Sequence, residues 1–276
     1  QANYAGSYVC VVTNAYGSVT SRVMALTVYP PQTTVFLDAF ETNSAARWQV
    51  NRSSADTRAT FDYDYSAMGI PSAPHSTGGT TRGLRLEANL AAGAVAALSL
   101  SPANQSFAGD YRVRFDMWIN ANGPFPGGGT GSTEHLTAGV GTAGNRVQWT
   151  ATGSTADGYW FAADGEGQAS DTSPTTGEYR AHVGASLQST TSGVYTAGTN
   201  TTAKGNGDGY YLDAFPTEQA APALQQTNYA QQTGVCAAGT LGFAWHEVVV
   251  AHRGSTVDWA VDGIRLATIT NAAFTA

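Results

Sequence analysis

Hydrophobic and polar residues alternate along much of this chain, and a period of two is typical of half-buried β-strands. The clearest alternating stretch is 111–120, where every second residue is apolar. Its other face carries Arg112, Arg114, Asp116, Trp118 and Asn120. Further strands are predicted at 59–65, 84–89, 95–100, 145–150, 158–163, 178–183, 240–252 and 257–269. No segment keeps a 3.6-residue period over three turns, so we predict no helix.

Many short strands separated by glycine-rich loops predict an all-β protein built as an antiparallel β-sandwich. Two stretches, 123–132 and 186–209, are too polar and too rich in Gly and Thr to be core segments. We expect them to be long surface loops, which is where sandwich proteins often bind their ligands.

The first residues predict a hairpin, with strands at 6–14 and 18–28 and a turn after Asn14. Tyr8 stands two residues before Cys10, the spacing of the tyrosine corner in immunoglobulin-like domains. Residues 1–29 therefore resemble the C-terminal hairpin of such a domain, without its earlier strands. Pro30 and Pro31 favour an extended backbone, so we expect a linker at 30–34 and a second domain at 35–276.

The second domain resembles the concanavalin A-like lectin and glucanase class, including laminin G-like domains. The resemblance rests on Trp245-His246 opening an apolar strand, on the Asp262-Gly263 turn, and on residues 36–41 followed by Trp48. It implies a jelly roll over 35–276. Jelly rolls of this class continue with further strands, so we expect this one to be truncated at its C-terminus. Open sheet edges would then allow self-association.

The amino-acid composition excludes some classes of function. The 276 residues are 42% hydrophobic and 12% charged, with a net charge of -7, so they can bury a core but offer no basic surface for nucleic acid. No run of about 18 apolar residues predicts a membrane span. Cys10 and Cys236 lack zinc-ligand spacing; we expect two buried thiols and leave a bridge between them open.

No catalytic constellation emerges. The Glu-x-Asp-x-x-Glu pattern of jelly-roll glucanases is absent, and the nearest carboxylate pairs are Asp62 with Asp64 and Asp164 with Glu166. We interpret both pairs as solvated carboxylates or metal-loop residues rather than catalytic groups. No serine-nucleophile elbow is present, and the five histidines form no recognisable triad.

A structural calcium ion is a further hypothesis, because calcium prefers hard oxygen ligands. Asp38 and Glu41 are placed like residues that help bind calcium in many carbohydrate-binding jelly rolls, an implication of the resemblance alone. Alternative acidic loops contain Asp164 and Glu166 with Asp171, or Asp208 with Asp213.

Trp118 is the most informative single residue. An indole among Arg112, Arg114, Asp116 and Asn120 would stack a sugar ring while its neighbours bind the hydroxyl groups, unless a loop covers it. Tyr159 is a second aromatic candidate for ligand binding, beside the acidic loop.

Three functional hypotheses follow. The first is a non-catalytic carbohydrate-binding or adhesive module of a secreted or cell-surface bacterial protein, with a glycan or polysaccharide as partner. The second is a polysaccharide-active glycoside hydrolase of the concanavalin A-like class. The third is a structural subunit of an extracellular array.

Overall fold

The computed structural model describes residues 4, 6–26, 28, 32–91, 95–122, 134–150, 153–167 and 177–273. The chain forms two compact units, Gln1–Asp38 and Ala39–Ala276, and each is described by itself. Pro30 and Pro31 of the expected linker, the loop 123–132 and Asp171 lie outside the described residues.

The first unit is a long antiparallel hairpin. Its strands are β1 (Gly6–Tyr8), β2 (Val11–Asn14), β3 (Gly17–Thr20) and β4 (Met24–Leu26), with β1 paired to β4 and β2 to β3. The turn lies at Asn14, whose side chain accepts a hydrogen bond from the amide of Tyr16 (2.8 Å). The hydroxyl of Tyr8 donates to the carbonyl of Tyr4 (2.7 Å), which is the kind of contact that a tyrosine corner makes. Cys10 is exposed, so the prediction that it is a buried thiol was wrong.

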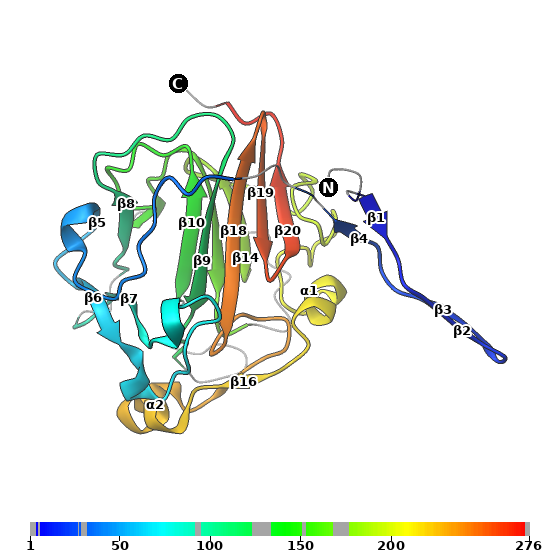
Figure 1. Ribbon diagram of the computed structural model, residues 1–276, viewed down its shortest axis with the longest axis horizontal. Helices are drawn as coiled ribbons and strands as arrows, with labels where there is room; N and C mark the ends of the chain where they lie inside the picture. Colours follow the sequence, from blue (N-terminus) through cyan, green and yellow to red (C-terminus); the bar gives the residue numbers. More distant parts are fainter. Residues whose placement is uncertain are drawn as a thin grey trace. The chain divides into compact units, whose positions relative to one another are not determined.

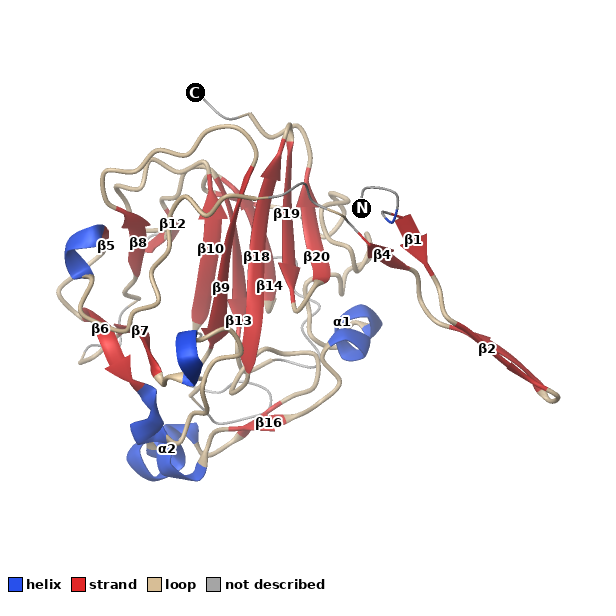
Figure 2. Ribbon diagram, viewed as in Figure 1, coloured by secondary structure: helices blue, strands red, loops and turns tan. Residues whose placement is uncertain are grey.

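The second unit contains two four-stranded antiparallel sheets (Figures 1 and 2). The first sheet has the order β20-β19-β18-β9, and the second has the order β10-β13-β14-β15. Their bounds are β9 (Tyr111–Trp118), β10 (His135–Val140), β13 (Tyr159–Asp164), β14 (Tyr179–Val183), β15 (Ser186–Leu187), β18 (Trp245–Arg253), β19 (Thr256–Val261) and β20 (Ile264–Ile269).

Four two-stranded ribbons accompany these sheets within the described residues of this unit. They pair β5 (Trp48–Arg52) with β8 (Leu98–Pro102), β6 (Thr57–Asp64) with β7 (Arg82–Ala88), β11 (Trp149–Thr150) with β12 (Gly153–Ser154), and β16 (Gln219–Ala220) with β17 (Val235–Cys236). In β6 the alternation breaks at Asp62, whose positive φ of 57° accompanies a shift in register. Asp62 and Asp64 therefore do not form the regular same-face pair that the sequence suggested.

Helical structure is short. The described chain has two α-helices, α1 (Gly209–Ala214) and α2 (Ala223–Asn228), and 3-10 turns lie at Ala45–Arg47, Tyr65–Met68, Thr77–Gly79 and Ala230–Gln232. The expectation of no helix was wrong for these two, because six residues are too few to establish a period. Asp208 caps α1 by accepting from the amide of Tyr210 (2.9 Å), which is ordinary turn chemistry for an Asp-Gly pair. No helix in the described part of the chain is long and apolar enough to cross a membrane.

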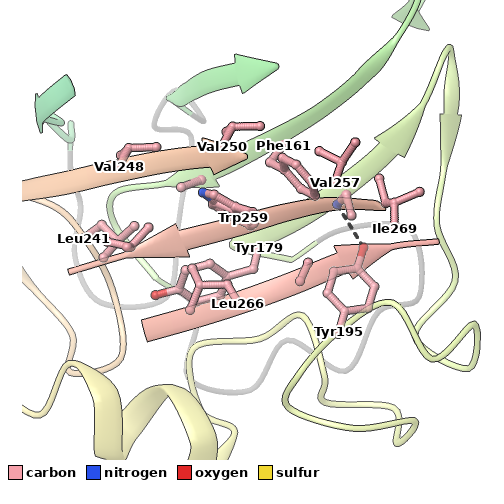
Figure 3. Packing of buried hydrophobic residues seen from close by; sticks show 14 of the residues in the cluster. Phe161, Tyr179, Tyr195, Leu241, Val248, Val250, Val257, Trp259, Leu266 and Ile269 are labelled. Atoms are coloured by element: carbon pink, nitrogen blue, oxygen red, sulfur yellow. Dashed lines mark hydrogen bonds between the residues drawn. The ribbon is translucent and has the colours of Figure 1, made fainter. Parts of the chain in front are cut away.

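The main core lies between the two four-stranded sheets (Figure 3). Phe161 of β13 stacks on Trp259 of β19 with ring centroids 5.2 Å apart, and Tyr179 of β14 stacks on Tyr211 of α1 at 3.9 Å. β19 buries one face through Val257, Trp259 and Val261, as its alternation predicted. Two sheets packed in this way confirm the all-β antiparallel sandwich.

The hairpin turn between β19 and β20 is also confirmed. Asp262 and Gly263 have φ values of 50° and 75°, the positive angles that a tight two-residue turn requires. The expected surface loop 186–209 is different: Tyr195 packs in the core, and Lys204 and Asn206 are buried. Its polar composition concealed this because hydrogen bonds to other strands and loops hold the segment in place: Tyr195 accepts from the amide of Ala181 (3.1 Å), and Asn206 Nδ2 donates to the carbonyl of Ala238 (2.9 Å).

Candidate functional site

The outer face of β9 and β18 carries the residues that the alternation of 111–120 singled out. Register places Trp118 opposite Trp245 and Asp116 opposite Glu247, while Arg112 lies opposite Ala251. We call the outward side chains Arg112, Arg114, Asp116, Trp118, Trp245 and Glu247, together with His75, the Trp118 platform.

Aromatic rings occupy one end of this platform. The Trp118 and Trp245 rings meet edge to face at 5.6 Å, and Tyr65 meets Trp245 at 5.2 Å. The Trp118 indole donates to Asn120 Oδ1 (2.8 Å), while the Trp245 indole donates to the carbonyl of Pro71 (2.7 Å). Both indoles are half-buried: Tyr65 and Pro71 contact Trp245, whereas Trp118 packs against a small buried cluster of Ala121, Ala221, Cys236 and Phe243.

Charged groups continue the platform beside the rings. His75 Nδ1 lies 2.8 Å from Asp116, whose other oxygen accepts from the His75 amide (2.7 Å). His75 Nε2 lies 3.8 Å from Glu247, which also pairs with Arg114. The sequence interpretation missed His75, Trp245 and Glu247. The alternation of β18 contained the signal for the last two, but Trp245 was assigned to the fold signature alone.

The outer face of the second sheet is different in character. Register across β10, β13 and β14 places His135 opposite Asp164, Ala162 opposite Arg180, and Trp160 opposite His182. We call His135, Asp164, Arg180, His182, Trp160 and the adjacent Trp149 the His182 face. Most of these side chains are buried, although they point away from the apolar core.

His182 is the most unusual residue on this face. Its ring stacks on Trp160 with centroids 3.8 Å apart, and Trp149 meets it edge to face at 5.9 Å. Both of its ring nitrogens are buried and, among the described residues, neither has a hydrogen-bond partner; the same holds for Nδ1 of His135. Leaving a buried polar atom unpaired costs about 1–3 kcal/mol.

Electrostatics keep both histidines neutral. Burial, followed by the positive charge of Arg180, lowers the pKa of His135 to about 3, and burial with Arg180 and Lys204 lowers the pKa of His182 to about 3. Arg180 also lies over the Trp149 ring (5.9 Å) and donates through Nε to the carbonyl of Gly177 (2.8 Å).

Carboxyl groups gather at the end of β13. Burial and the nearby Glu178 raise the pKa of Asp164 to about 7. Burial, Asp164 and a hydrogen bond with Glu134 raise the pKa of Glu166 well above its ordinary value. Glu134 accepts from Asn122 (2.8 Å), which places Glu134 at the end of an amide network. The network continues through Gln232 and Gln225 to Asn120, with hydrogen bonds of 3.1, 2.7 and 2.7 Å.

The hypothesis of a metal ion gains no support from this geometry. In the portion of the chain that the structure describes, no three Asp, Glu, His or Cys side chains gather as metal ligands. Asp38 and Glu41 belong to different compact units, and Glu41 accepts a hydrogen bond from Thr80. Calcium binding by Asp38 and Glu41, or by Asp164 and Glu166, stays a prediction.

Tyr159 has a structural role. Its ring belongs to the main core, and its hydroxyl bonds the backbone of Ala273. Cys236 is a free, buried thiol, and burial together with Glu166 raises its pKa to about 12.

No family model, curated protein or solved structure matches this chain. The resemblance to concanavalin A-like and immunoglobulin-like domains therefore stays a prediction, and function must be argued from the two outer faces themselves.

Proposed function

We propose that this chain is a carbohydrate-binding module of a secreted or cell-surface protein, and that the Trp118 platform binds the glycan. One observation carries the proposal: a half-buried indole lies beside a continuous set of hydrogen-bonding groups on the outer face of a sheet. An aromatic ring contributes stacking area to a sugar, and flanking polar groups fix its orientation.

The polar groups suit hydroxyl ligands. His75, Asp116, Glu247 and Arg114 offer both donors and acceptors, and their mutual contacts hold them in place before a ligand arrives. Such preorganisation lowers the entropy that binding would otherwise cost. The side chains of His75 and Arg114 are 51% and 43% exposed, so a ligand can reach them.

The test is glycan-array screening followed by calorimetry on the strongest neutral oligosaccharide, with Trp118→Ala. Loss of one stacking contact of about 1–2 kcal/mol should weaken binding about tenfold. Trp118 also packs against the buried cluster of Ala121, Ala221, Cys236 and Phe243, so the variant should melt several degrees lower. Trp48→Ala is the matched control: Trp48 is a half-buried tryptophan that stacks on Phe40 at 5.6 Å, and its strand β5 belongs to a different sheet from β9 and β18.

Unchanged affinity in a folded Trp118→Ala variant would contradict the proposal, as would equal loss in both variants. Absence of binding to every neutral glycan would contradict it as well.

Glycoside hydrolysis is a second candidate because the raised pKa values of Asp164 and Glu166 would provide a protonated carboxyl group near neutral pH. Release of reducing ends that Asp164→Asn abolishes would favour hydrolysis over simple binding.

A further inference from the structure

The indole of Trp118 is held by one oxygen atom that accepts from two donors. Asn120 Oδ1 accepts from Trp118 Nε1 (2.8 Å) and from Gln225 Nε2 (2.7 Å). Asn120 is exposed, so packing alone does not decide which end of its amide faces the indole. If this amide turned over, it would present a donor to the indole N–H, and two donors cannot bond each other. The bond from Gln225 therefore keeps the oxygen of Asn120 directed at Trp118.

Gln225 is fixed in turn by further amides behind it. It is the buried residue of α2, and its Nε2 also donates to Gln232 Oε1 (2.7 Å). Gln232 donates to Asn122 Oδ1 (3.1 Å), and Asn122 donates to Glu134 (2.8 Å). We call the side chains of Asn120, Gln225, Gln232 and Asn122 the amide network.

The groups at the two ends of the amide network require the same direction of hydrogen bonding. A carboxylate only accepts, so Glu134 requires the NH2 end of Asn122 and leaves the oxygen of Asn122 for the next donor. An indole only donates, so Trp118 requires the oxygen of Asn120. An acceptor at one end and a donor at the other thus favour one arrangement of all four amides.

The oxygen of Gln225 shows that this side chain is committed to donation. Gln225 Oε1 is buried and, within the described residues, accepts no hydrogen bond, whereas Nε2 donates twice. An unpaired buried oxygen destabilises the folded chain, so the two bonds from the nitrogen must offset that cost. One of those two bonds orients the acceptor of Trp118.

We propose that Gln225 and Asn120 are positioning residues for the glycan site, because they hold the Trp118 indole in the orientation in which it stacks on a sugar ring. This inference rests on the proposed function of the Trp118 platform. It adds that a fully buried glutamine on α2, which a ligand cannot touch, sets the affinity of the platform. Without the bond from Gln225 the ring loses its fixed acceptor, and binding must then order the ring as well, which lowers affinity.

The variant that tests the role of Gln225 is Gln225→Met, because methionine is a flexible side chain of similar length that carries no N–H donor. The indole N–H signal of Trp118 in a nitrogen-15 NMR spectrum should shift, and its hydrogen exchange should quicken about fivefold for one lost hydrogen bond. Affinity for the neutral oligosaccharide, measured by calorimetry, should fall about threefold to tenfold.

Gln226→Met is the matched control for the change in α2. Gln226 is the next residue of the same helix, and its Nε2 donates to the carbonyl of Ala221 (2.7 Å), outside the amide network. This variant also loses a side-chain hydrogen bond. The Trp118 signal and the affinity should nevertheless stay at the parent values.

Rescue by a carboxylate separates positioning from a general loss of packing. In the double variant Gln225→Met with Asn120→Asp, the new carboxylate offers only acceptors, so it bonds the indole without help from Gln225. We expect the Trp118 signal to return and the affinity to recover to within about twofold of the parent. Asn120→Ala, at an exposed site where folding is not at risk, should reproduce the effects of Gln225→Met, whereas Asn120→Asp alone should not.

A Trp118 signal that is the same in Gln225→Met and in the parent would overturn the inference, as would a loss of affinity that Asn120→Asp does not restore. Equal effects of Gln225→Met and Gln226→Met would show that α2 acts through packing alone. Absence of glycan binding by the parent would instead contradict the proposed function. The indole signals need no ligand, so they would still decide whether Gln225 positions Trp118.

Discussion

The two outer faces of the sandwich bury their polar groups to very different extents. On the Trp118 platform His75, Arg114 and Glu247 are partly exposed, and the charged side chains pair with one another, as His75 does with the more buried Asp116. On the His182 face Arg180 is 7% exposed and His182 is 1% exposed, and several polar atoms are unsatisfied within the described chain. Both faces belong to sheets that share one apolar core.

This difference in the burial of polar groups determines how a bound ligand would affect each face. Exposed ion pairs contribute little to stability and are already solvated, so the platform can bind a ligand with little effect on the fold. Buried unsatisfied groups destabilise the unliganded protein, so a ligand that satisfies them stabilises it. The platform should therefore show its function mainly in affinity, and the His182 face in stability as well.

The largest expected loss of stability comes from Gly139→Ala in β10, because a side chain at this position would collide with the neighbouring strand β13. In Gly139→Ala the new Cβ would lie 2.6 Å from Cβ of Trp160 and 2.8 Å from the carbonyl oxygen of Tyr159. Because two packed strands must separate, we expect a loss of about 3 kcal/mol and a drop in melting temperature on the order of 10 °C. The drop in melting temperature is measured by thermal unfolding with circular dichroism as the signal.

Gly209→Ala is the control for that experiment, since a Cβ at Gly209 meets no atom within 4 Å. It should melt within about 2 °C of the parent. A Gly139→Ala variant as stable as the control would show that β10 and β13 are packed less closely than described.

The second effect is a dependence of stability on pH between about pH 4.5 and 8, to which shifted groups on the His182 side of the sandwich contribute most. The folded chain holds protons on Asp164 and Glu166 that the unfolded chain releases above about pH 4, so these groups lower the free energy of unfolding as pH rises. His135 and His182 act oppositely up to about pH 6.5, because only the unfolded chain protonates them there. Stability should be nearly level from pH 4.5 to 6.5 and fall by about 2 kcal/mol from pH 6.5 to 8.

Urea unfolding at a series of pH values measures this profile. Glu166→Gln should remove most of the decline above pH 6.5. Glu87→Gln should leave it intact, because Arg58 lowers rather than raises the pKa of Glu87. A decline that persists unchanged in Glu166→Gln would assign it to other groups.

The smallest effect is expected on the platform. Arg114→Ala removes the exposed ion pair with Glu247 and should cost less than about 1 kcal/mol. Affinity for the neutral oligosaccharide should fall more visibly, by about threefold to tenfold, because Arg114 borders the bound sugar in the proposal. Loss of stability greater than that of Trp118→Ala would show that the platform is structural rather than functional.

Much of the fold could be predicted because strand periodicity reports which face is buried. The stretch 111–120 predicted β9 together with its inward Met117 and its outward Arg114, and Asp262-Gly263 predicted the β19–β20 turn. The bulge at Asp62 and helix α1 could not be predicted in this way, since both depend on local backbone geometry rather than on a repeating pattern.

The candidate sites were predictable only in part. Alternation identified Trp118 and Asp116, but His75 reaches them from a segment 41 residues away in sequence from Asp116. On the His182 face the sequence singled out Asp164 but not Arg180 or His182, because strand β14 places these two on a face that any solvated strand could present. Only the packing of Trp160 and Trp149 against them shows that the charges are buried.

The most direct test uses the indole N–H signals of the six tryptophans in a heteronuclear NMR spectrum of the nitrogen-15-labelled protein. Trp118 and Trp245 report on the platform, Trp149 and Trp160 on the His182 face, and Trp48 and Trp259 on the remainder of the sandwich. The account predicts that the neutral oligosaccharide shifts the signals of Trp118 and Trp245 and leaves those of Trp149 and Trp160 in place. Shifts confined to the other four tryptophans, or no shift at all, would contradict it.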